Sequence, residues 1–151
     1  MTRISLRRIV PVALVLAVAL PISISAAQPS AARASRHSGA VFTFGRSGGN
    51  IQPFTVVIAR DGSISSSGAA PASLAPRASL DAVDGLVALA RAEDFYALPT
   101  LVLCPGSLPD VAGQFVTIKT GTASKKVTVR GSCRTGFTQL YAVVSAVAGA
   151  G

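Results

Sequence analysis

Few side chains in this 151-residue chain are suited to catalysis or to metal binding, because it has two cysteines, one histidine and six acidic residues. The histidine, His37, lies in an Ala/Ser/Arg-rich stretch ahead of the regular elements. The main body of the chain therefore lacks the usual general base for a serine or cysteine nucleophile. No two acidic residues are placed as a catalytic carboxylate pair would be. The pattern favours a protein that is not an enzyme and has no cofactor or metal site.

Cys104 and Cys133 are the two cysteines. In an exported protein an even pair of cysteines is most simply a disulfide. Closing a loop of about thirty residues stabilises a fold by roughly 3–4 kcal/mol. Two free thiols or half of a metal site are the alternatives, although a single pair without partnering histidines is a poor zinc site. We expect the disulfide.

A glycine-rich segment at 44–64, FGRSGGNIQPFTVVIARDGSI, raises the question of a phosphate-binding loop. Such a loop ends in Gly-Lys-Ser/Thr and opens a helix, and a dinucleotide-binding fingerprint also needs a helix after its glycines. Here no lysine follows the glycines, and the chain enters a strand. The segment is therefore predicted to connect two strands, and any function would be that of an exposed loop. The candidate partner-binding residues are Arg46, Ser47, Gly48, Gly49 and Asn50.

Two hairpins are predicted from alternating and β-branched residues. The first has strands at 41–45 and 54–60, and Asp61-Gly62 then predicts a type I′ turn into a short polar strand at 63–67. The second joins strands at 114–120 and 125–131. Between the hairpins, the Pro/Gly-rich stretch 100–113 is predicted to be an irregular loop.

Two amphipathic segments predict helices. Ser79 fits the N-cap of the first helix, which is followed by a short turn that directs Phe95 and Leu98 toward the core. Thr135 is expected to cap the second helix, which carries Phe137 and Leu140 on its apolar face. Together the elements predict an α+β fold, with an antiparallel sheet of about four to five strands and two helices packed on one face.

The N-terminal region has the pattern of a secretory signal peptide. The basic MTRISLRR precedes IVPVALVLAVAL, an apolar stretch of about twelve residues, whereas a membrane-spanning helix needs about twenty. Ser25 and Ala27 fit a cleavage site. We therefore expect a signal peptide at 1–27, a flexible linker at 28–39, a single domain at 40–149 and an extracytoplasmic location. Membrane attachment is expected only through an uncleaved signal.

Charge and composition argue against nucleic-acid binding. From Ala40 onward nine Lys/Arg face six Asp/Glu, and the chain has no tryptophan, so there is neither a strong basic patch nor a stacking platform. Lys126 and Arg130 have the same parity on one predicted strand and are expected on one exposed face. They are either ordinary solubilising charge or a weakly basic patch for an acidic protein surface or a cell-wall polymer.

The order of these features resembles the emfourin family, small proteins that inhibit thermolysin-like metallopeptidases of the protealysin type. The likeness lies in RSGG at 46–49, DG at 61–62, ARAEDFYALP at 90–99 and the terminal strand-strand-helix. It covers roughly residues 41 to 148 and departs from the family in the cysteine pair and the CPGSLPD loop. The resemblance implies a secreted binding module that inhibits or regulates a metallopeptidase. The alternative is a secreted or envelope-associated domain with an unknown partner and no protease target.

Overall fold

A computed structural model describes residues 37–108 and 110–151. The expected signal peptide (1–27) and most of the expected linker (28–39) lie outside the described residues. The described part contains strands β1 (Val41–Ser47), β2 (Phe54–Ile58) and β3 (Ile64–Gly68), then helix α1 (Leu80–Ala92) and the 3₁₀ turn η1 (Phe95–Ala97). Strands β4 (Leu101–Leu103), β5 (Gly113–Thr120) and β6 (Ala123–Arg130) and helix α2 (Thr135–Val147) complete it.

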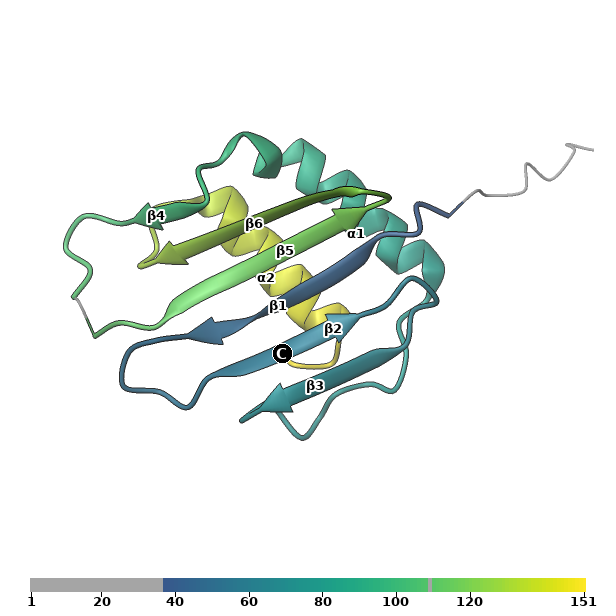
Figure 1. Cartoon of the computed structure of the whole chain (residues 1–151), viewed down its shortest axis with the longest axis horizontal. Coiled ribbons are helices and arrows are strands. Elements are labelled where there is room, and N and C mark those ends of the chain that lie inside the picture. Colours follow the sequence, from purple (N-terminus) through teal and green to yellow (C-terminus); the bar gives the residue numbers. More distant parts are fainter. Residues whose placement is uncertain (1–36, 109) are drawn as a thin grey trace, which may run out of the picture. The chain divides into compact units, whose positions relative to one another are not determined.

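The strands form one sheet in the order β3-β2-β1-β5-β6-β4 (Figure 1). All neighbours are antiparallel except β4, which pairs in parallel with β6. The α+β class is confirmed, but the sheet has six strands rather than the expected four to five. The additional strand, β4, falls in the stretch predicted to be an irregular loop, because three residues are too few to show an alternating pattern.

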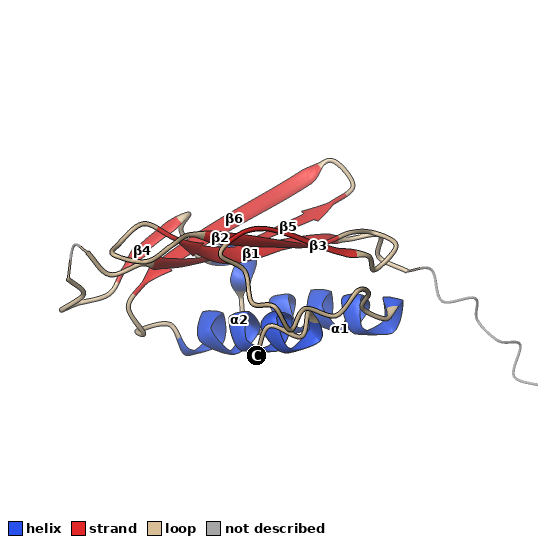
Figure 2. Ribbon diagram, turned by 90° about the horizontal axis from the view of Figure 1, so that it is seen from below, coloured by secondary structure: helices blue, strands red, loops and turns tan. Residues whose placement is uncertain are grey.

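Both helices cover the same face of the sheet, as Figure 2 shows. Side chains that alternate along the strands fill the space between the layers. The largest fully buried ones from the strands are Phe42, Phe44, Val56, Ile58, Ile118, Val116 and Val127, and those from the helical segments are Val83, Leu86, Phe95, Phe137 and Leu140. Among the described residues no helix is both long and apolar enough to cross a bilayer.

The turn between β2 and β3 differs from the predicted type I′. Asp94 is the one non-glycine residue with a positive φ in the described part, so Asp61 does not adopt the conformation that a type I′ turn requires. Instead the Gly62 N–H donates to the Ala59 carbonyl at 2.9 Å and the Ala59 N–H donates to the Ser63 carbonyl at 2.8 Å. The result is a three-residue loop with Gly62 at φ 82°. The Asp61 carboxylate accepts hydrogen bonds from the Ser63 N–H and hydroxyl, which favours this turn.

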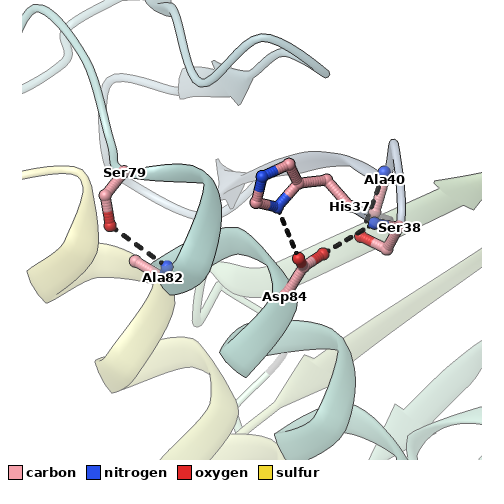
Figure 3. A network of polar contacts seen from close by, with 6 residues as sticks. All are labelled: His37, Ser38, Ala40, Ser79, Ala82 and Asp84. Carbon is pink, nitrogen blue, oxygen red and sulfur yellow. Dashed lines mark hydrogen bonds and ion pairs between the residues drawn. The ribbon is translucent and has the colours of Figure 1, made fainter. Parts of the chain in front are cut away.

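The two helices begin differently. The Ser79 hydroxyl accepts a hydrogen bond from the Ala82 N–H at 3.1 Å, which confirms the predicted N-cap of α1 (Figure 3). Helix α2 has Arg134 rather than Thr135 at its N-cap position, without a side-chain capping bond. Phe137 and Leu140 are buried, as the apolar periodicity predicted.

Candidate functional site

Three connecting segments meet at one end of the sheet, which we call the loop end. They are residues 48–53 between β1 and β2, residues 104–108 with 110–112 between β4 and β5, and residues 131–134 between β6 and α2. The register brings them together, because Ser47 pairs with Gly113 and Leu103 pairs with Arg130. In Figure 1 the first two segments lie at the left. The predicted partner-binding residues and the disulfide all lie at this end.

The predicted loop residues divide between a strand and a turn. Arg46 and Ser47 are the last residues of β1 rather than part of the loop. Gly48 and Gly49 form the turn with φ angles of 73° and 65°, a conformation that glycine adopts without steric cost. Asn50 follows the turn, and all five of the predicted partner-binding residues are exposed.

The β1–β2 turn is bonded to the β4–β5 loop through Asn50 and Asp110. The Asn50 N–H donates to the Asp110 carbonyl at 3.2 Å, and the Asn50 Nδ2 donates to the Asp110 Oδ2 at 3.3 Å. A Cβ at Gly49 would overlap the Asp110 carbonyl oxygen and lie 2.6 Å from the Ala112 nitrogen. Glycine is therefore needed at this position for the two loops to come so close.

Arg46 belongs to a different environment from the turn. It has the parity of Phe42 and Phe44, so its side chain leaves β1 on the face that the helices cover. There it approaches Tyr141 of α2, whose ring stacks on Phe137 with centroids 6.3 Å apart. Burial raises the pKa of Tyr141, and the Arg46 charge partly opposes that rise. The Arg46 side chain thus leaves β1 on the helix-covered face, whereas the Gly48–Asn50 turn lies beyond the end of the strand.

The disulfide between Cys104 and Cys133 is present, with Cα atoms 5.4 Å apart. It joins the start of the β4–β5 loop to the segment just before α2, as the sequence predicted. Cys104 is buried and its N–H donates to the Arg130 carbonyl at 2.9 Å. The Ser107 hydroxyl donates to the Cys104 carbonyl at 2.8 Å. One end of the β4–β5 loop is therefore attached covalently, and its other half is bonded to Asn50.

Large apolar side chains are exposed on and beside this loop. Leu103, Leu108 and Val111 are 62%, 64% and 36% exposed. Leu101 has the same parity on β4 as Leu103 and is also exposed. None of these residues was among the predicted site residues, although large apolar residues inside a Pro/Gly-rich stretch are a signal of such a surface. Exposed apolar side chains that gather in one place mark interaction sites.

Arg130 occupies the uncovered face of the sheet beside this apolar group. The Arg130 side chain crosses Gly113, because a Cβ added at Gly113 would lie 3.5 Å from the Arg130 Cγ. The side chain reaches the β1–β2 turn, where a Cβ added at Gly48 would lie 3.6 Å from an Arg130 Nη. The Arg130 Nε is buried and has no hydrogen-bond acceptor among the described residues. Lys126 lies on the same face, with its Nζ 4.8 Å from the centre of the Phe115 ring. The expectation that Lys126 and Arg130 share a face is confirmed.

A hollow of about 350 Å³ lies against Arg130. Its lining residues are Leu103, Cys104, Ser107, Leu108 and Arg130. The hollow thus has an apolar wall formed by two leucines, and Cys104 of the disulfide and the Arg130 side chain also line it. A second hollow, of about 330 Å³, borders the segment before α2 and is lined by Glu93, Asp94 and Arg134 among others, but it contains neither Leu103 nor Leu108.

His37 lies at the opposite end of the sheet. Its Nδ1 is 2.8 Å from the Asp84 Oδ2, and the Ser38 N–H donates to the Asp84 Oδ1 at 2.7 Å (Figure 3). Hydrogen bonding from Ser38, and then from His37, lowers the pKa of Asp84 to about 2. These contacts attach the start of the domain to α1, and they are remote from the loop end.

The loop end offers exposed apolar side chains, a hollow and the Arg130 cation as features that a partner could contact. Within residues 37–108 and 110–151, no three His, Cys, Asp or Glu side chains are grouped so that they could hold a metal ion. Comparison of the chain with protein-family models, curated proteins and solved structures finds none that matches it.

Proposed function

We propose that this protein is a secreted, non-enzymatic binding module that contacts a protein partner through its loop end. The observation that carries the proposal is the group of exposed apolar side chains formed by Leu103, at the end of β4, and by Leu108 and Val111, on the following loop with its two attachments. A binding loop that is attached at two points has less conformational entropy to lose when its partner binds. The disulfide, together with the N-terminal sequence, supports an extracytoplasmic location.

We further propose that the partner is a thermolysin-like metallopeptidase and that binding inhibits it. The support for this step is the sequence resemblance to the emfourin family, which spans the domain. Inhibition would follow if the loop end covered the substrate-binding cleft, where the exposed apolar side chains of a loop attached at two points would exclude substrate.

An inhibition titration tests this proposal. We expect the oxidised protein to abolish the activity of a thermolysin-like peptidase stoichiometrically. Leu108→Ser should weaken inhibition about tenfold or more, as expected when one large side chain is removed from the centre of an interface. Val143→Ser is the matched control, because Val143 is also an exposed apolar residue but lies on α2. Undiminished peptidase activity at micromolar excess of the wild-type protein, across several such enzymes, would overturn the proposal.

One observation favours a second function, association with an anionic polymer of the cell envelope. The six strands contain no acidic residue, while Lys119, Lys126 and Arg130 lie on the face that the helices leave uncovered. A surface with one sign of charge attracts polymers of the opposite sign. Co-sedimentation with an acidic cell-wall polymer, measured at low and high salt, tests this function.

A further inference from the structure

We propose that the hollow beside Arg130 binds the free C-terminus of a peptide that ends in a large apolar residue. The terminal carboxylate would pair with the Arg130 guanidinium, and the terminal side chain would lie between Leu103 and Leu108. This inference deepens the proposed function and rests on it in one respect, that the peptide belongs to the partner.

The charge of Arg130 is the feature of the hollow that favours an anionic ligand. Its Nε is buried without an acceptor, and neither of the ion pairs in the described part of the chain involves it. Asp110, the acidic residue of the neighbouring loop, is engaged by Asn50 instead. A cation that has lost solvent on one side and has no counter-ion is stabilised by an anion that enters beside it. The planar guanidinium suits a carboxylate, which it can bind through two N–H groups.

Two leucine side chains form much of the remaining wall of the hollow. Leu103 and Leu108 are both largely exposed, and they contribute the apolar lining of the hollow. Its volume of about 350 Å³ is near the lower end of the range for small-ligand pockets, which begins at about 300 Å³. That volume accommodates a ligand group about the size of one amino acid. The expected ligand therefore has a carboxylate and one large apolar group close together.

The backbone of β4 favours a peptide over a fatty acid as the ligand that carries the carboxylate and the apolar group. The Cys104 N–H points toward β6, where it donates to the Arg130 carbonyl. Because amide groups alternate along a strand, the Leu103 N–H points to the other side. β4 is the last strand in the sheet order, so that side is a sheet edge. An extended peptide can pair with such an edge while its end enters the hollow.

Fluorescence anisotropy with a labelled hexapeptide that ends in leucine tests the inference. We expect the oxidised protein to bind the free-acid peptide about tenfold or more tightly than the same peptide with a C-terminal amide, because the amide loses a charge-assisted hydrogen bond. Decanoate, a fatty acid, distinguishes a peptide from a fatty acid as the natural ligand. We expect it to compete only weakly with the labelled peptide. Equal binding of acid and amide, no binding of the acid at millimolar concentration, or decanoate binding as tight as the peptide would each overturn the inference.

Arg130→Gln provides the variant, and Lys126→Gln is its matched control, since Lys126 lies on the same strand and face and the charge change is the same. We expect Arg130→Gln to abolish the preference for acid over amide and Lys126→Gln to keep it. This preference is a ratio measured on folded protein, so it does not depend on how stable each variant is. A preference that persists in Arg130→Gln would contradict the assignment.

Failure of this inference can be told from failure of the proposed function. If the wild-type protein inhibits a peptidase but shows no preference for the acid peptide, the inference about the hollow is wrong and the proposed function stands. If it binds the acid peptide selectively but inhibits no peptidase, the hollow is a peptide-binding site and the peptidase proposal is wrong.

Discussion

Gly49 is the residue on which the close approach of two loops depends. Its φ is positive, and a side chain there would overlap the backbone of the β4–β5 loop at Asp110 and Ala112. Two costs therefore combine in any substitution. One is the left-handed backbone, and the other is the displacement of the loop that carries Leu108 and Val111.

We predict that Gly49→Ala lowers the free energy of unfolding by about 1–2 kcal/mol for the left-handed backbone and by a further ~1–3 kcal/mol for the overlap. Gly121→Ala is the matched control, because Gly121 has a φ of 58° and nothing within 4 Å of its Cβ position. Urea unfolding of both variants measures the difference. Equal losses would show that the β4–β5 loop moves aside freely and that Gly49 does not hold the two loops together.

Asp84 gives a prediction about pH. Its pKa is about 2 in the folded protein, against an ordinary value of 3.8. A carboxyl whose pKa is lowered by folding stabilises the fold above its unfolded pKa, and this stabilisation is lost as the pH falls toward the folded pKa. Asp84→Asn should therefore be less stable than the wild type at pH 6, and the difference should vanish between about pH 4 and pH 2.

Thermal unfolding from pH 6 to pH 2 measures this difference, with Asp81→Asn as the control because Asp81 lies in the first turn of the same helix. A wild-type advantage over Asp84→Asn that stayed constant down to pH 2 would contradict the assignment of the low pKa to Asp84.

At the scale of elements, β4 depends on the disulfide more than the longer strands do. It has three residues, pairs with one neighbour and is followed directly by Cys104. We predict that Cys104→Ala with Cys133→Ala destabilises the fold by about 3–4 kcal/mol, the loss expected from opening a loop of this length. Urea unfolding gives the energy, and hydrogen exchange shows whether the amides of β4 lose protection first. Unchanged protection of β4 would mean that pairing with β6 alone holds it.

The elements that sequence analysis placed correctly are those with a repeated pattern. The strands of both hairpins were found from alternating or β-branched residues, and the two helices were found because their apolar residues follow a period of 3.6. Strand β4 was missed because it is too short to show a period and because its pairing with β6 is parallel and distant in sequence. The turn at Asp61 was predicted wrongly because the Asp-Gly pair occurs in more than one turn type, and the bonds from Ser63 favour a different one.

Only part of the candidate site could be predicted, because the rest depends on contacts between residues far apart in the sequence. The turn at Gly48 and Gly49 and the cysteine pair could be recognised from residue type alone. The partner of Asn50 is Asp110, sixty residues away, and no local pattern gives such a pairing. Arg130 was recognised as an exposed cation, but its course across Gly113 depends on strand register, which the sequence does not reveal without the sheet order.

At the scale of the whole domain, the two proposed functions are placed on different surfaces, the loop end and the uncovered face of the sheet. The helices occupy one face, and the other presents Lys119 and Lys126 without an acidic residue from any strand. The apolar group at the loop end lies at the termini of the strands and on the loop that follows β4. A partner that binds Leu108 therefore need not contact Lys119, and a polymer that lies along the sheet need not contact Leu108.

This separation predicts a double dissociation between two sets of variants. Leu108→Ser with Val111→Ser should weaken peptidase inhibition about tenfold or more and leave binding to an anionic polymer unchanged. Lys119→Gln with Lys126→Gln should weaken polymer binding and its salt dependence and leave inhibition unchanged. Inhibition titration and co-sedimentation, each carried out on both double variants, measure the two effects. All four side chains are exposed, so the fold should tolerate the substitutions. If either pair weakened both activities equally, one continuous surface would serve both partners, and the division between loop end and sheet face would be wrong.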